Sequence, residues 1–193
     1  MKIIGLTGGI GMGKSTIAAA FRRARIPVFD ADATVHALQT RGGRAVRAIG
    51  QAFPGAVRNG AVDRAALRAI VIPDPPSMRV LERILHPMVR VAERAFLARA
   101  RRARRPVVVL DIPLLLETGG ERRVDLVLVV SAPRSVQRAR VRARRRMTEA
   151  QIDTIIARQM PDAEKRRRAD VIISTGLSRY HALRHLRRLI QDL

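Results

Sequence analysis

The sequence predicts an α/β fold in which helices flank a parallel sheet of five strands, and two observations support this prediction. First, short apolar runs alternate along the chain with longer stretches of helical pattern, which is the order that builds a parallel sheet. The expected strands are residues 2–7, 28–29, 106–111, 124–130 and 170–173. Second, the first strand leads directly into a glycine-rich loop and a helical stretch, residues 16–24.

The glycine-rich loop has the spacing of a phosphate-binding loop. Gly8, Gly13, Lys14 and Ser15 fit the P-loop pattern at every position, in the required setting between a strand and a helix. Glycine lets the backbone double back so that several N–H groups face one polyphosphate, and the following helix adds a favourable dipole. Lys14 can then reach the β- and γ-phosphates, while Ser15 can ligate Mg²⁺. The sequence therefore predicts a P-loop NTPase fold that binds a nucleoside triphosphate.

Composition limits the other function classes. The 193 residues suffice for one domain with small insertions, and the absence of cysteine excludes disulfides and thiolate metal sites. No apolar run approaches the ~18–20 residues of a membrane span. The N-terminus has no signal-peptide pattern, so we expect a cytoplasmic protein without a membrane partner.

The net charge of +22 allows two interpretations. Basic patches bind nucleic acids through phosphate contacts, but a site for a small molecule with several phosphates also needs positive charge. The arginines are spread from Arg22 to Arg188 and lack the interleaved aromatic residues of a single-strand binder. We therefore expect no specific nucleic-acid partner.

Three carboxylates follow the ends of predicted strands, where α/β sheets bind their ligands. Asp30 and Asp32 come directly after the second strand, and either could also cap the helix that begins near Ala33. We expect a catalytic or metal-binding role for Asp32 in particular. Asp111 ends the third strand, where it could orient the Mg²⁺ shell or simply stand in a turn.

The stretch between the second and third strands, residues 33–105, is too long for a simple crossover and predicts an inserted helical domain that binds the substrate. His86 is either a core or helix-boundary residue, or a substrate contact. Pro87 would fit the first turn of a new helix. Pro54-Gly55 and Asn59-Gly60 mark a loop, and Asp63 is the expected N-cap of the helix that follows. The expected helices are residues 33–40, 44–53, 64–70, 74–86 and 87–102.

A strongly basic segment follows the fourth strand, and we expect residues 134–168 to form a helical lid. Residues 134–146 contain seven arginines and no acidic residue. Arg140 and Arg144 are four residues apart and project from one side of a helix, and Arg138 and Arg142 form a second such pair. Most of these arginines fit a solvated face, but at least one pair is expected to contact the transferring phosphates.

The remaining segments complete the predicted core, which comprises residues 1–32, 106–133 and 169–193. Leucines between Pro113 and Glu117, on the loop that leaves the third strand, suggest a surface that covers a ligand or meets the helical insertion. A capping box at residues 148–151 predicts a helix to residue 159, and Ser178 would cap a final helix, residues 179–192.

Several of these segments together resemble one family, the dephospho-CoA kinases, over nearly the full length. They are the stretch 7–16, Asp30-Ala31-Asp32, His86-Pro87, the stretch 113–117, Gln137, Arg140, Arg144, Gln159 and the stretch 169–172. The resemblance implies transfer of the γ-phosphoryl group of ATP to the 3′-hydroxyl of the ribose of dephospho-CoA, with Mg²⁺. Another small-molecule kinase, such as one acting on nucleoside monophosphates, and a nucleic-acid-dependent NTPase are the alternatives.

The resemblance also implies roles for individual residues. Asp32 would accept the proton of the acceptor hydroxyl or orient it, and Arg140 and Arg144 would neutralise the transferring group. Ser15 and Asp111 would hold Mg²⁺. The ATP phosphates would bind Gly11, Met12, Gly13, Lys14, Ser15 and Thr16, and the substrate would contact Thr7, Asp32, His86, Pro113, Leu114, Leu115 and Glu117.

Three positions depart from the family pattern. Met12 stands where a small serine is usual, which makes the rim of the loop more apolar. Arg145-Arg146 replaces a commonly acidic element of the lid, and Ser174-Thr175 replaces an asparagine-rich segment near the adenine. We therefore assign no adenine contacts from the sequence.

Overall fold

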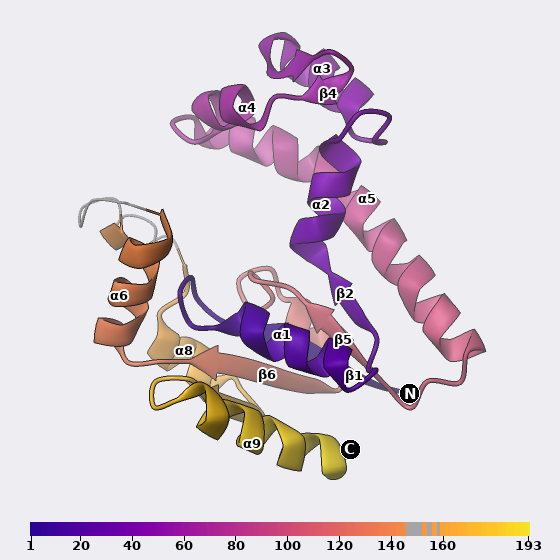
Figure 1. Cartoon of the computed structure of the whole chain (residues 1–193). Helices are drawn as coiled ribbons and strands as arrows, with labels where there is room; N and C mark the ends of the chain where they lie inside the picture. Colours follow the sequence, from indigo (N-terminus) through magenta and orange to yellow (C-terminus); the bar gives the residue numbers. More distant parts are fainter. Residues whose placement is uncertain (146–151, 154–155, 158) are drawn as a thin grey trace. The chain divides into compact units, whose positions relative to one another are not determined.

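A computed structural model describes residues 1–145, 152, 153, 156, 157 and 159–193 (Figure 1). The chain divides into two compact units. The first unit comprises residues 1–29 and 100–193, and the second comprises residues 30–99. Each unit is described separately below. Within the described residues, no helix is long and apolar enough to cross a bilayer.

The first unit is built on a five-stranded sheet, which confirms the predicted fold class. Its strand order is β2-β5-β1-β6-β7, with β1 at the centre (Figure 1). The bounds are β1 Lys2–Thr7, β2 Val28–Asp30, β5 Val107–Asp111, β6 Leu126–Ser131 and β7 Val171–Ser174. β1 pairs in parallel with β5 and β6, and β6 pairs in parallel with β7. The carboxyl ends of these strands therefore lie at one edge of the sheet.

Alternation of side chains along the strands fills a core on each face of this sheet. Leu128 and Val130 of β6 pack in one cluster with residues of α1 (Lys14–Arg23) and α9 (Arg179–Gln191). Val127 and Val129 of the same strand pack on the other face with Leu115 and Leu116. A strand buried on both faces has the continuous apolar sequence that predicted it.

Helices of the first unit begin close to their expected positions. The Ser178 hydroxyl accepts a hydrogen bond of 3.1 Å from the His181 N–H, which confirms the predicted cap of α9. The basic segment forms α6 (Arg134–Arg145), and Pro161 precedes the short α8 (Asp162–Arg167). A 3₁₀ turn, Gly120–Arg123, leads towards β6. The predicted capping box at residues 148–151 lies outside the described residues.

The second unit is helical around its own apolar cluster, which includes Ile49, Phe53, Leu67, Leu81 and Leu85. Its elements are α2 Ala31–Gln39, α3 Val46–Ala52, the 3₁₀ turn Pro54–Ala56, β3 Val57–Arg58, β4 Ala61–Val62, α4 Arg64–Val71 and α5 Pro75–Arg102. The last residues of α5 belong to the first unit.

A side-chain cap stabilises the start of α4. Asp63 caps this helix as predicted, because its Oδ1 accepts the N–H groups of Ala65 and Ala66, each at 3.0 Å. The hydrogen bond from the Ala66 N–H is the largest cause that lowers the pKa of Asp63.

The expected loop at Asn59-Gly60 is instead the turn of an antiparallel pair, β3 with β4, and both residues have positive φ. Asn-Gly is the strongest short-range signal for such a hairpin, so the sequence did contain this information.

The prediction that Pro87 opens a new helix is wrong. A single helix of 28 residues, α5, contains Pro87 in its interior. Proline has no N–H to donate to the carbonyl four residues earlier, which costs an α-helix about 3 kcal/mol. Leu81 and Leu85 are buried just before Pro87 and Met88 packs against the same cluster, so tertiary packing holds the helix through this position.

Pro87→Ala should therefore stabilise the chain. Alanine restores a hydrogen bond to the Arg83 carbonyl, while losing the restriction that proline imposes on the unfolded chain, so we expect a gain of about 1–3 kcal/mol. Urea unfolding followed by far-UV circular dichroism measures it, with Arg99→Ala on the exposed side of α5 as a control that should change little. An unfolding midpoint at or below that of the original chain would contradict the cost assigned to Pro87.

Candidate active site

The phosphate-binding loop lies between β1 and α1. Gly11 and Gly13 have φ values of 76° and 92°, which side chains rarely adopt, so the loop depends on glycine at both positions. A Cβ at Gly11 would also lie 2.8 Å from Val141 Cγ2 on α6. No side chain of the described residues caps the start of α1. The first N–H groups of α1 are thus suited to bind an anion.

Two glutamines hold the middle of this loop from other segments. The Ile10 N–H donates to Gln159 Oε1, and Gln137 Nε2 donates to the Ile10 carbonyl, both at 2.9 Å. The buried side chain of Met12 adds a third contact, because its Sδ lies 3.1 Å from the Ala132 N–H. The loop is therefore fixed by side chains before any phosphate binds.

Lys14 and Asp111 form the central contact of the site. The Lys14 Nζ lies 2.5 Å from Asp111 Oδ1, and the two side chains are 18% and 5% exposed. The sheet register explains the contact, since Leu6 of β1 pairs with Asp111 at the end of β5. The lysine of the P-loop pattern and the carboxylate expected near Mg²⁺ thus share one place at the carboxyl edge of the sheet.

A buried polar network joins the loop after β5 to β1 and to α8. The Pro113 carbonyl accepts hydrogen bonds from Thr7 Oγ1 at 2.9 Å and from Lys165 Nζ at 3.4 Å. Lys165 Nζ also pairs with Glu117 Oε1 at 2.8 Å, and the Met160 N–H donates to the same oxygen at 3.0 Å. Lys165 is fully buried, yet it stands in a basic run of the sequence that gives no signal of this role.

The expected substrate contacts in this region differ in their exposure to solvent. Thr7 and Leu115 are both 0% exposed, so neither offers a side-chain atom to a ligand in this structure. Leu115 instead belongs to the core beside β6, and only Leu114 of this loop presents an exposed leucine. Glu117 forms an ion pair with Lys165, and this contact stabilises the fold.

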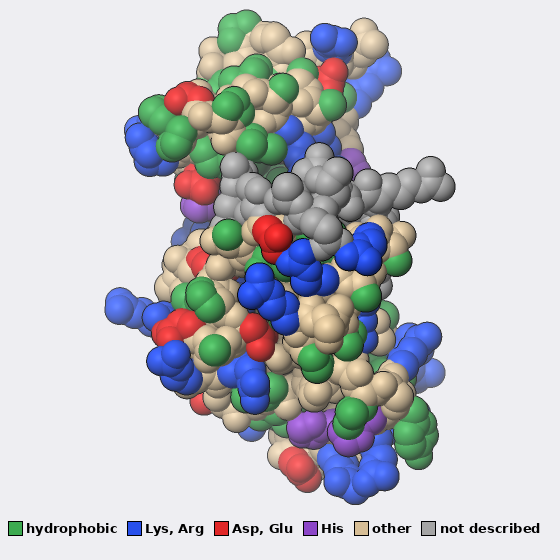
Figure 2. Space-filling view, turned by 90° about the vertical axis from the view of Figure 1, so that its left-hand side faces the viewer, with side chains coloured by type: hydrophobic (Ala, Val, Ile, Leu, Met, Phe, Trp, Pro, Cys, Tyr) green, Lys and Arg blue, Asp and Glu red, His purple; other side chains and the backbone are tan. Residues whose placement is uncertain are grey.

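The arginines of α6 differ in their surroundings. Arg140 Nη2 donates to the Thr175 carbonyl at 2.6 Å, and Arg140 Nη1 donates to the Thr175 hydroxyl at 2.8 Å. Arg138 pairs with Asp153, and this hydrogen bond is the largest cause that lowers the pKa of Asp153. The side chain of Arg144, which was expected to act with Arg140, lies outside the described residues. Figure 2 shows basic side chains spread over one face of the molecule, with acidic and apolar side chains between them.

Asp30 ends β2 and caps α2, whereas Asp32 lies within α2. Asp30 caps this helix, because its Oδ1 accepts the Ala33 N–H at 2.9 Å, and its carbonyl accepts the Thr34 hydroxyl at 2.8 Å. The capping alternative therefore holds for Asp30. Asp32 lies in the first turn of α2 and is exposed, so its carboxylate is open to solvent.

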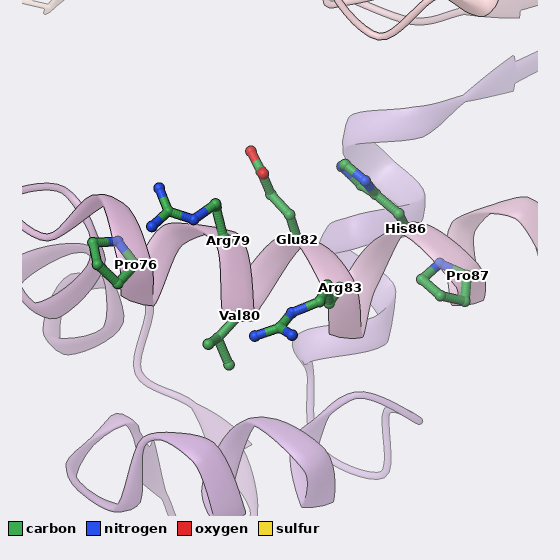
Figure 3. A pocket seen from close by; sticks show the side chains of 7 residues that line it. All are labelled: Pro76, Arg79, Val80, Glu82, Arg83, His86 and Pro87. Atoms are coloured by element: carbon green, nitrogen blue, oxygen red, sulfur yellow. The ribbon is translucent and has the colours of Figure 1, made fainter.

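His86 is exposed on α5, which excludes a core role in this structure. It lines an open groove of about 700 Å³ together with Arg79, Glu82 and Arg83 (Figure 3). Figure 3 shows Arg79, Glu82 and His86 on one side of the helix axis. Two arginines against one glutamate give this groove an excess of positive charge, which suits an anionic group.

The acidic and histidine side chains bear on the choice of metal. Within the described parts of the chain, no three or more of them gather into a group that could hold a metal ion alone. Mg²⁺ does not need such a cage, because it usually keeps several waters and binds one or two carboxylates together with substrate phosphates. The Ser15 hydroxyl at the start of α1 and the Asp111 carboxylate beside Lys14 fit this requirement.

Comparison with known proteins gives a consistent result. A family model described as dephospho-CoA kinase matches residues 2–178. A dephospho-CoA kinase of Paramagnetospirillum magneticum is 64% identical over 86% of this chain and 78% of its own length. One of Gluconobacter oxydans is 52% identical over 100% of this chain and 98% of its own. A crystal structure, TT1252 from Thermus thermophilus, has a TM-score of 0.85 at 37% identity and covers 100% of this chain and 97% of its own.

Lys165→Met tests the buried network. The variant keeps a long side chain but leaves the Glu117 carboxylate without its cation, so we expect a loss of about 3–5 kcal/mol in the free energy of unfolding. The double variant Lys165→Met with Glu117→Gln should lose less, because no charge remains unpaired. Arg166→Met at the exposed neighbouring position is the matched control. Urea unfolding of the original chain and the three variants measures these free energies. A Lys165→Met variant as stable as Arg166→Met would show that the ion pair does not stabilise the fold.

Proposed function

The chain belongs to the dephospho-CoA kinase family, and from this premise we propose that it transfers the γ-phosphoryl group of ATP to the 3′-hydroxyl of the ribose of dephospho-CoA. Coenzyme A and ADP are the products, so the reaction completes coenzyme A synthesis. The observation that supports ATP binding is the contact of Lys14 with Asp111, at the end of a loop shaped for phosphates. The acceptor is supported by the similarity to relatives that are named for it.

In this proposal residues 11–16 bind the ATP phosphates. The triphosphate competes with Asp111 for the Lys14 ammonium, and the backbone N–H groups at the start of α1 bind the remaining oxygens. Ser15 and Asp111 would hold Mg²⁺, which would supply positive charge to neutralise the ATP phosphates. The Lys14–Asp111 ion pair must break before Lys14 can bind a ligand. The affinity of the loop therefore depends on how much negative charge the ligand brings.

The acceptor is proposed to be held by the helical domain, residues 33–105, and by the loop after β5. Asp32 accepts the proton of the 3′-hydroxyl or orients it, a role that its exposed carboxylate permits. His86 and its groove bind an anionic part of dephospho-CoA, and Leu114 and Pro113 contact the substrate at the core. Positioning supplies most of the catalysis in phosphoryl transfer, so these contacts matter more than covalent chemistry.

Arg140 and Arg144 are proposed to neutralise the transferring group from the lid, residues 134–168. The closed lid excludes water, which would otherwise hydrolyse the bound nucleotide. We therefore expect little ATP hydrolysis when no acceptor is present. ATP and dephospho-CoA are the only partners that this proposal requires.

Purified protein incubated with ATP, Mg²⁺ and dephospho-CoA should form coenzyme A, detected by mass spectrometry. A 3′-deoxy analogue of dephospho-CoA should not react, which tests the position of transfer. Nucleoside monophosphates in the same coupled assay test the alternative acceptor class, and added RNA or DNA tests the nucleic-acid-dependent one. Faster turnover with any of these than with dephospho-CoA would refute the proposal. Lys14→Ala, which removes the phosphate-binding ammonium, should abolish product formation and serves as the blank.

Asp32→Asn should lower the rate of transfer by about 10²–10⁴-fold, the usual contribution of a positioned acid or base. ATP affinity, measured by titration calorimetry, should remain because the phosphate loop is unchanged. Asp30→Asn is the matched control, since asparagine also caps helices well and the variant removes a neighbouring charge without removing the cap. Full turnover by Asp32→Asn would end the assignment.

Arg140→Ala should lower kcat by on the order of 10³-fold or more, the effect of losing an arginine that stabilises a phosphoryl-transfer transition state. Steady-state assays measure kcat, and circular dichroism shows whether the fold is retained. Arg142→Ala, at an exposed position of the same helix, should keep most of the rate. If both variants were equally active, Arg140 would leave the list of catalytic residues.

A further inference from the structure

Thr175 is a buried residue at which several segments of the first unit meet, and no role was assigned to it from the sequence. It follows β7 directly and is 6% exposed. Its N–H donates to the Ser131 carbonyl at 2.9 Å, which continues the pairing of β7 with β6. The backbone of Thr175 is therefore anchored to the sheet, independently of any contact with the lid.

The hydroxyl of Thr175 links the phosphate loop to Arg140. It donates to the Met12 carbonyl at 2.6 Å and accepts from Arg140 Nη1 at 2.8 Å. A hydroxyl has one proton and two lone pairs, so both contacts can exist at the same time. Arg140 Nη2 donates to the carbonyl of the same threonine at 2.6 Å, so the planar guanidinium binds one residue through two parallel contacts.

The same threonine packs against the residue that opens α1. A Cβ at Gly13 would lie 3.2 Å from the Thr175 hydroxyl oxygen, so the two residues are in direct contact. Arg140 Nη1 also lies 3.4 Å from the Gly11 carbonyl. The guanidinium is thus held beside the loop by Thr175, whose backbone is hydrogen-bonded to β6.

We propose that Thr175 is a positioning residue for phosphoryl transfer: its hydroxyl couples the Met12 carbonyl to the Arg140 guanidinium, so that the arginine is oriented beside the phosphate loop before ATP binds. This inference rests on the proposed role of Arg140. An arginine side chain that is free to move must be ordered during the reaction, and a rigid supporting contact removes that cost.

Two variants separate the hydroxyl from the rest of the side chain. Thr175→Ala removes the hydroxyl, whereas Thr175→Ser keeps it and removes only the methyl group. Valine is a poorer choice, because a methyl group in place of the hydroxyl would press on the Met12 carbonyl, which lies 2.6 Å from the present oxygen. Rates with dephospho-CoA, calorimetric affinities for ATP with Mg²⁺ and thermal unfolding are measured for each protein.

We expect Thr175→Ala to lower kcat about 10- to 100-fold, the size of losing a hydrogen bond to a charged group. Thr175→Ser should stay within about threefold of the original rate, because it preserves that bond. The KM for ATP should change much less than kcat. In an Arg140→Ala background, Thr175→Ala should have little further effect on kcat, since a residue that acts through Arg140 has nothing left to position.

Other results would overturn the inference. Normal kcat in Thr175→Ala, an equally slow Thr175→Ser, or full multiplication of the two losses in the double variant would each show that the hydroxyl does not act through Arg140. If Thr175→Ala does not fold, Thr175→Cys keeps the size with a weak donor and acceptor, and it should also be slower than Thr175→Ser. Because turnover by the unmodified chain is measured alongside, failure of the inference is distinct from failure of the proposed function.

Discussion

The ion pair between Lys14 and Asp111 is the contact on which the candidate site depends. It joins the start of α1 to the end of β5, and it exists because β1 and β5 are neighbours in a sheet whose register places Leu6 opposite Asp111. A largely buried carboxylate needs a cation, and a P-loop lysine without phosphate needs an anion. The two residues satisfy each other in the chain alone, and both are proposed to bind a magnesium nucleotide.

Three cationic side chains near the candidate site differ in what they contact. Lys14 and Arg138 pair with carboxylates, so part of their charge is already balanced. The hydrogen-bond acceptors of Arg140 described above are neutral carbonyl and hydroxyl oxygens, which fix the direction of the guanidinium without cancelling its charge. An arginine held in this way keeps its attraction for an anion, and this matches the role proposed for it.

The sequence predicted those parts of the molecule that local patterns determine. The five strands, the phosphate loop and the caps at Asp63 and Ser178 each have a signal within a few residues, and the structure contains them. The interior position of Pro87 was not predicted, because packing of α5 against its cluster outweighs a local preference. Lys165 and Thr175 could not be found from their neighbours in sequence, since their partners are 48 and 163 residues away. The roles of Asp32, His86 and Arg144 remain predictions.

The close approach of Gly11 to α6 has a mechanical consequence. Where the loop passes the Gln137 carbonyl and Val141, there is no space for even one additional carbon atom. The first turns of α6 and the phosphate loop are therefore packed tightly together, so neither can move without displacing the other. Movement of this part of α6 would therefore require the phosphate loop to move with it.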